Sequence, residues 1–174
     1  MGLNEQGRTL RGALPLLLAA TCSVEVEDIP LDLHQVKTSF LFNLLRFIEW
    51  PDDAAYGKGR LNLGIYGAYS LRAFQALNGA RAGDRTISVR RLKDLAAARL
   101  KKRHVLVVSG DVPVLSVPIA RGLLTVGETE GFIACGGIIN LFLIDGRVRF
   151  QINEDVAHAC GFRIDSRLLR LGMR

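Results

Sequence analysis

Apolar residues recur at helical spacing from residue 33 to residue 50 and predict a helix that Pro51 ends. One apolar face has the three-and-four spacing of a helix and consists of Leu33, Val36, Phe40, Leu44 and Phe47. A second apolar flank lies beside it and consists of Leu41, Phe42, Leu45 and Ile48. A helix that is apolar over so much of its circumference is either a central core helix or a core helix that keeps one flank for a partner.

Strand-like apolar runs alternate with helical segments over the middle of the chain. The predicted strands cover residues 61–66, 86–90, 104–108 and 123–126. The predicted helices cover residues 71–77, after the cap Ser70, and 92–102, and a loop is expected at 79–84. The continuous apolar run at 104–108 is typical of a strand buried on both faces. This alternation predicts an α/β layer with a largely parallel sheet.

The last third of the chain changes to a hairpin pattern. Asp145 and Gly146 separate the runs 138–144 and 147–152, and an Asp-Gly pair in that position predicts a two-residue β-hairpin turn. A helix over 154–160, a strand over 162–164 and a last helix from Ser166, its cap, through Leu171 complete the pattern. The predicted fold is a single-domain α/β layered sandwich over residues 31–174. It has a mixed, mostly parallel sheet, a C-terminal antiparallel hairpin and flanking helices.

The first residues have the pattern of a secretory signal peptide. Arg8 and Arg11 precede a short apolar stretch, and small residues follow it. The stretch is too short to span a bilayer, and Pro15 would break a folded helix there. We therefore expect a signal peptide over residues 1–22 and export out of the cytoplasm. The alternative is a lipoprotein whose first mature residue is Cys22.

Export would place the two remaining cysteines, Cys135 and Cys160, in an oxidising compartment. An even pair of cysteines in such a compartment can form a disulfide. Sequence does not fix the geometry of the pair, so two buried free thiols are the equal alternative.

Composition supports a folded domain and limits its partners. Of 174 residues 49% are hydrophobic and 23% charged, with a mean hydropathy of +0.21, which excludes a charge-rich disordered chain. The net charge is +6, but the basic residues are spread along the chain. The densest basic cluster, at 99–103, contains no aromatic residue, so we predict no nucleic-acid partner.

The sequence contains no motif for catalysis or for cofactor binding. Its three histidines, His34, His104 and His158, stand apart without the spacing of metal ligands. Nucleophile-elbow, zinc-protease and phosphate-loop patterns are absent. We therefore predict a protein with no catalytic residue, no metal and no cofactor. Because open α/β sheets bind ligands beyond the carboxyl ends of their strands, a small-ligand receptor with its rim at 67–70 and 109–111 is the alternative function.

Several segments, taken in order, resemble the YfiR family. They are Phe-Ile-Glu-Trp-Pro at 47–51, Leu-Thr-Val at 124–126, a Gly-Gly pair before a strand, and Phe-Gln-Ile-Asn at 150–153. The resemblance covers about residues 34–171. Its landmark positions are Lys37, Phe40, Asn43, Trp50, Pro51, Gly136, Gly137, Phe150 and Asn153. Three of them also have a structural interpretation: Lys37 as a helix end, Trp50 as a core plug and Asn153 as a helix cap.

This resemblance implies a small periplasmic α/β protein without enzymatic activity. The best-known member represses an inner-membrane diguanylate cyclase by acting on its periplasmic sensor region, which lowers cyclic di-GMP and disfavours biofilm formation. The resemblance thus implies a membrane-bound signalling partner, and a homodimer is a further implied assembly. The partner or dimer surface is expected to use the exposed members of the helix flank and two residues of the last helix, namely Leu41, Phe42, Leu45, Ile48, Ser166 and Leu169.

Three positions depart from the family pattern. Gln151 replaces a glutamate that is common between the Phe and Ile of that segment, so a contact that needs the carboxylate is not expected. Residues 61–66 lack a cysteine that is common there, and Arg103 replaces another. The disulfide pattern of the family therefore does not transfer to Cys135 and Cys160.

Overall fold

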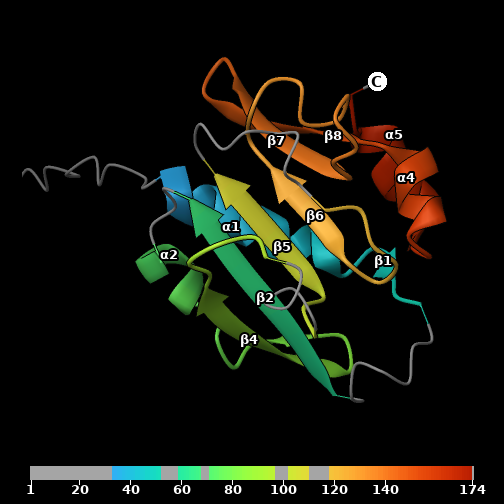
Figure 1. Cartoon of the computed structure of the whole chain (residues 1–174). Helices are drawn as coiled ribbons and strands as arrows, with labels where there is room; N and C mark the ends of the chain where they lie inside the picture. The colour runs from blue at the N-terminus through green and yellow to red at the C-terminus, as the bar shows by residue number, and fades with distance from the viewer. Residues whose placement is uncertain (1–32, 52–58, 68–70, 97–101, 110–117, 174) are drawn as a thin grey trace, which may run out of the picture. The chain divides into compact units, whose positions relative to one another are not determined.

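A computed structural model describes residues 33–51, 59–67, 71–96, 102–109 and 118–173 (Figure 1). The predicted signal peptide over 1–22, the cap Ser70 and most of the rim expected at 67–70 and 109–111 lie outside these ranges. Within them, no helix is long and apolar enough to cross a membrane.

A seven-stranded sheet forms the centre of the fold, in the order β3-β4-β2-β5-β6-β7-β8. Its five inner strands run parallel, and they are β4 (Arg85–Arg91), β2 (Arg60–Gly67), β5 (Val105–Ser109), β6 (Leu124–Gly127) and β7 (Ile139–Ile144). The two edge strands, β3 (Arg81–Ala82) and β8 (Arg147–Ile152), are antiparallel to their neighbours. The predicted α/β fold with a mostly parallel sheet and a C-terminal hairpin is therefore confirmed.

The turn between β7 and β8 forms where the Asp-Gly pair predicts it. Asp145 has a φ of 49° and Gly146 a φ of 71°, and both values are left-handed, as the favoured two-residue hairpin turn requires. The hairpin of β3 and β4 was not expected, because residues 79–84 look like a loop. There Arg81 pairs with Thr86 around the turn, and a strand of two residues is too short to leave a sequence pattern.

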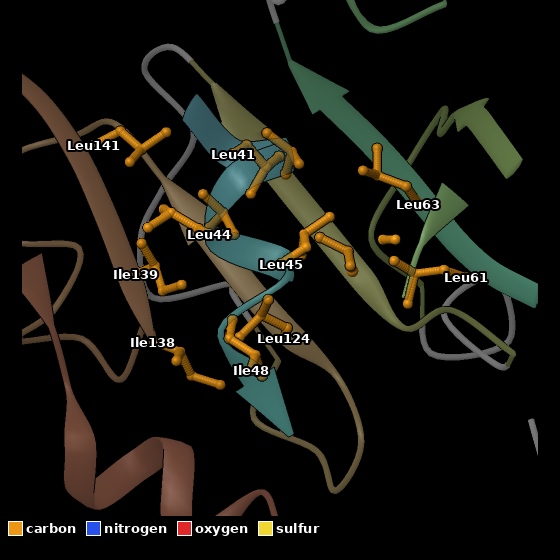
Figure 2. Close-up of a cluster of buried hydrophobic side chains, with 14 of the residues drawn as sticks. Leu41, Leu44, Leu45, Ile48, Leu61, Leu63, Leu124, Ile138, Ile139 and Leu141 are labelled. Atoms are coloured by element: carbon orange, nitrogen blue, oxygen red, sulfur yellow. The ribbon is translucent and has the colours of Figure 1, made fainter. Parts of the chain in front are cut away.

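The helix α1 (Leu33–Leu45) covers one face of the sheet and lies behind it in Figure 1. Figure 2 shows Leu41, Leu44 and Leu45 gathered with Leu124 and Ile139 of the sheet. All five side chains are at most 3% exposed and belong to the main hydrophobic core. The interpretation of this helix as a central core helix is therefore correct.

The prediction that this helix continues to residue 50 is wrong. α1 ends at Leu45, the chain turns through Arg46 and Phe47, and Ile48–Glu49 forms the short strand β1. β1 pairs antiparallel with β9 (Arg163–Ile164) in a separate two-stranded sheet. The apolar spacing continues past the end of the helix because Ile48 still faces the core, although its backbone is extended.

The described part of the helix predicted over 92–102 is also not helical. The backbone N–H of Leu92 donates to the carbonyl of Ile65 at 2.7 Å and prolongs the pairing of β4 with β2. Residues 97–101 lie outside the described ranges. On the face of the sheet opposite α1, which we call the outer face, Leu92 belongs to a second apolar cluster with Leu106, Val108, Leu123 and Phe132.

The ring of Phe132 accounts for the absence of a side chain at Gly137, the second residue of the pair Gly136 and Gly137. A Cβ atom on Gly137 would lie 2.1 Å from the ring of Phe132, and one on Gly127 would lie 2.4 Å from it. Gly136 has a φ of 90°, a conformation that side chains disfavour. The pair therefore makes a tight turn before β7 and leaves room for an aromatic ring on the outer face.

The described residues form three further helices, namely α2 (Leu71–Gln75), α4 (Glu154–Ala159) and α5 (Ser166–Leu171). The Oδ1 atom of Asn153 accepts a hydrogen bond from the N–H of Val156 at 3.1 Å at the start of α4. Asn153 is thus a helix cap, as its structural interpretation predicts.

Candidate functional site

An apolar groove of about 280 Å³ lies between α1, β8 and α5. Its apolar lining consists of Phe40, Leu44, Phe47, Val148, Phe150, Leu168 and Leu171. We call it the α1–β8–α5 groove. The landmark Asn43 and Arg149, both exposed, supply its polar edge.

The floor of the groove is buried, whereas its rim is open to solvent. Phe150 and Leu168 are at most 5% exposed, and the rings of Phe40 and Phe150 lie 5.5 Å apart at their centroids. On the rim, Phe47 is 38% and Leu171 71% exposed. Large apolar side chains at the mouth of an apolar groove are typical of a surface that binds another protein.

The turn after α1 and the start of α5 are joined, which fixes the shape of the groove. The N–H of Asp165 donates to the carbonyl of Phe47 at 3.0 Å, next to the pairing of β1 with β9. The guanidinium of Arg167 lies over the ring of Phe47, 5.7 Å from its centroid. The turn after α1 and the start of α5 therefore hold one rim of the groove together.

Asp165, rather than Ser166, caps α5. The Asp165 carboxylate accepts a hydrogen bond from the backbone N–H of Arg167 at 2.8 Å. It also forms an ion pair with the Arg167 guanidinium at 2.7 Å. A carboxylate one residue earlier reaches the free N–H groups of the first turn, so the helix starts at Ser166, whose own side chain is exposed.

The helix α5 is expected to become less stable in acid. Hydrogen bonds from the side chain and backbone of Arg167 lower the pKa of Asp165 from 3.8 to about 2. Because this pKa is depressed on folding, the carboxylate stabilises the folded state above about pH 4, and that stabilisation is lost as the pH falls to about 2. An NMR titration of the carboxyl carbon should have its midpoint near 2, and a midpoint near 4 would contradict the capping geometry.

The flank expected to serve a partner lies mostly in the core. Leu41, Leu45 and Ile48 are at most 5% exposed, so none of the three is available to a partner. Phe42 is half-buried against the same core. On α5, Ser166 is exposed and Leu169 is half-buried. The exposed apolar rim instead comes from Phe47 and Leu171. The exposure of Phe47 could not be predicted, because the apolar spacing places it inside a longer helix.

The landmark Trp50 packs at the edge of the core, as a plug would. Its half-buried ring meets the ring of Phe162 edge-on at 5.3 Å and the ring of His104 at 6.2 Å. The guanidinium of Arg85 lies over the Trp50 ring at 5.6 Å. The neighbouring landmark Pro51 is half-buried and, like Trp50, borders a separate polar pocket with Arg121.

Lys37 is not a helix end but one member of a polar cluster at the carboxyl ends of β5 and β6. Its ammonium donates to one oxygen of the Glu128 carboxylate, and the hydroxyl of Ser109 donates to the other. The side chains of Lys37 and Glu128 are only 11% and 15% exposed. The cluster has the form of a largely buried ion pair that ties α1 to the sheet, and the hydroxyl of Ser109 is part of the same hydrogen-bond network.

Cys135 and Cys160 are both free thiols in the structure. Cys135 is exposed and Cys160 is buried. The structure therefore has neither the expected disulfide between them nor the alternative, in which both thiols are free and buried. Burial raises the pKa of the Cys160 thiol, although a hydrogen bond with the backbone of Ala120 opposes this effect.

A thiol reagent is therefore expected to modify Cys135 and to spare Cys160 in the native protein. Only the thiolate reacts, and burial of Cys160 both hides the sulfur and disfavours the thiolate. Peptide-level mass spectrometry after a short reaction measures both sites, with the denatured protein as the control in which both react. Rapid native labelling of Cys160 would show that this part of the core opens.

Among the described residues, no group of three or more histidine, cysteine or acidic side chains could hold a metal ion. Comparison with known families gives one finding. Residues 34–173 match the model of the YfiR/HmsC-like family, which is nearly the whole of the described structure. No curated protein matches the chain.

Proposed function

The chain belongs to the YfiR/HmsC-like family, and on that premise we propose that it is an exported, non-enzymatic regulator of an inner-membrane signalling protein. It binds the periplasmic part of that partner, a diguanylate cyclase, and represses it, which lowers cyclic di-GMP. The family assignment and the predicted signal peptide support the location and the class of partner. The α1–β8–α5 groove supports binding to a protein rather than catalysis.

The observation that carries this proposal is the apolar rim of the groove. Leu171 is the most exposed large apolar side chain of the described structure, and it stands over a buried apolar floor. The apolar surface continues onto the hairpin, where Leu143 is 42% exposed and lies directly opposite Val148. A few buried apolar anchors carry most of the binding energy of an interface, so Leu171 is the expected anchor.

The Leu171→Glu variant tests the proposal in the native host. The substitution is expected to weaken partner binding about thirtyfold, the effect of losing one interface hot spot, and to raise cyclic di-GMP toward the level of a deletion strain. The matched control is Ile119→Glu, because Ile119 is also apolar and 58% exposed but does not line the groove. Full repression by Leu171→Glu would reject the groove as the repressing surface.

A small-ligand receptor is the second candidate function, and a separate pocket favours it. This pocket of about 430 Å³ lies beside the carboxyl end of β6 and includes Glu128, Glu130 and Asn140 in its lining. Asn140 is 6% exposed, and its Oδ1 atom is buried without a hydrogen-bond partner among the described residues. The Glu128 carboxylate is already paired with Lys37, and the exposed carboxylate of Glu130 with the amide of Asn140 suits an amine-bearing molecule, such as a diamine.

A thermal-shift titration with a diamine separates the two functions. A ligand that binds only the folded protein raises the melting temperature, so a receptor should show a saturable increase that the Glu130→Gln variant loses. An unchanged melting temperature in the wild type would remove this candidate and leave the regulator as the proposed function.

A further inference from the structure

Two arginines lie together over a glycine on the outer face of the sheet. Arg90 of β4 is the register partner of Gly64 of β2, and register partners in a sheet project to the same face. The Cδ atom of Arg103 lies 3.6 Å from the position that a Cβ atom on Gly64 would occupy. Leu92 fills the remaining space at 2.8 Å from that position. A side chain on Gly64 would therefore collide with Leu92, and the stem of Arg103 lies next to the same glycine, on the face that Arg90 shares.

The two guanidinium groups are held in an unfavourable electrostatic state. Burial, and secondarily the charge of Arg90, lower the pKa of Arg103. The Nε atom of Arg103 is buried and donates no hydrogen bond within the described structure. A buried donor without an acceptor costs roughly 1–3 kcal/mol, and a like charge nearby adds to that cost.

No acidic side chain of the described residues compensates this charge. Neither arginine forms an ion pair there. The adjoining register pair on the same face, Asn62 and Ser88, is neutral. The Nδ2 group of Asn62 donates to the carbonyl of Lys102 at 2.8 Å, which holds the turn that positions Arg103. The geometry is thus fixed by the fold, whereas none of the described residues supplies the counter-charge.

We propose that Arg90 and Arg103 form a binding site for an oxyanion of the phosphate class. Two guanidinium groups on one face, close enough to interact electrostatically, offer planar donor pairs that match phosphate oxygens, and an anion would supply both an acceptor for the Nε atom and the counter-charge. The phosphate is presented either as a free ion or ester or as the headgroup of an anionic lipid. In the sheet order, β5, β6 and β7 separate this site on β2 and β4 from the groove at β8. An anion here therefore leaves the groove accessible.

The test measures binding of the purified protein to inorganic phosphate by calorimetry and to vesicles by sedimentation. Vesicles of phosphatidylcholine with added phosphatidylglycerol are compared with pure phosphatidylcholine. The variants are Arg90→Gln and Arg103→Gln, and the matched control is Arg147→Gln, which removes the same charge from an exposed position on β8 at the opposite edge of the sheet. Each site variant should weaken binding at least about fivefold, and the control should bind as the wild type does.

A thermal melt keeps the test valid if Arg103→Gln folds poorly. At low ionic strength Arg90→Gln, whose side chain is exposed, should melt above the wild type because the repulsion is gone. Phosphate should raise the melting temperature of the wild type and leave that of Arg90→Gln unchanged. Saturable binding to phosphate identifies a free oxyanion, and binding only to phosphatidylglycerol vesicles identifies a lipid headgroup. Absence of both, or equal weakening in Arg147→Gln, would overturn the proposal.

Discussion

Replacing Gly67 by alanine is expected to destabilise the protein by about 3 kcal/mol or more, enough to leave little folded protein in a domain of ordinary stability. A Cβ atom at this position would lie 1.9 Å from the carbonyl oxygen of Ser109, which is backbone of the neighbouring strand and cannot rotate away. Gly67 also has a φ of 98°, in the region that side chains disfavour. The substitution therefore pushes β5 away from β2 at the carboxyl ends of these two inner strands.

Gly79→Ala is the matched control for this prediction. Gly79 has a φ of 87°, but no atom lies within 4 Å of the position of its Cβ. Its substitution should therefore cost only the conformational penalty of about 1 kcal/mol. Chemical denaturation of both variants measures the difference. Equal stability of Gly67→Ala and Gly79→Ala would show that β2 and β5 do not approach as closely as their pairing requires.

The Glu128→Gln variant is expected to lose about 3 kcal/mol of stability, the usual result of removing one partner of a buried ion pair. Lys37 and Glu128 are both mostly buried, so the neutral amide would leave the Lys37 ammonium without a counter-charge inside the fold. The amide would also replace the carboxylate that accepts the Ser109 hydroxyl. Because Lys37 belongs to α1, the loss should loosen the helix that covers the core.

A double variant separates the lost ion pair from other effects. Adding Lys37→Met to Glu128→Gln removes the unpaired charge and should recover most of the lost stability. Glu130→Gln is the matched control, since Glu130 is an exposed acid two residues along the chain, and its stability should stay within about 0.5 kcal/mol of the wild type. If Glu128→Gln behaves as Glu130→Gln does, the Lys37–Glu128 pair contributes no net stability.

The parts of the fold that local chemistry determines could be predicted from the sequence. Asp145 and Gly146 favour left-handed backbone, so the β7–β8 turn forms where the pair stands. Asn153 caps α4 through a hydrogen bond that spans three residues. The apolar run of β5 indicates a strand buried on both faces, and the residues 105–109 are indeed all buried.

The end of α1 could not be predicted, because it depends on a distant segment. The apolar spacing runs on through Ile48, but Ile48 and Glu49 pair with Ile164 and Arg163, which are more than a hundred residues away in the chain. No local pattern reports such a pairing. The same limit applies to Leu92, which continues a strand because the carbonyl of Ile65 lies beside it.

The candidate site could be predicted only in part for the same reason. The sequence indicates an apolar helix and a last helix that contribute to a surface, and α1 and α5 do border the groove. It cannot distinguish Leu41, which is buried, from Phe47, which is exposed only because α1 ends before it. Lys37 likewise resembles a helix end until Glu128, 91 residues away, is seen to be its partner.

The central claim is that the α1–β8–α5 groove holds the membrane partner, and photo-crosslinking in intact cells of the native host tests it most directly. A photoreactive amino acid is placed at position 171 on the rim of the groove or, as the control, at position 119 outside it. Position 171 should capture an inner-membrane protein that mass spectrometry identifies by its cytoplasmic cyclase domain, and position 119 should not. Repression that persists without capture from position 171, or equal capture from both positions, would contradict the claim.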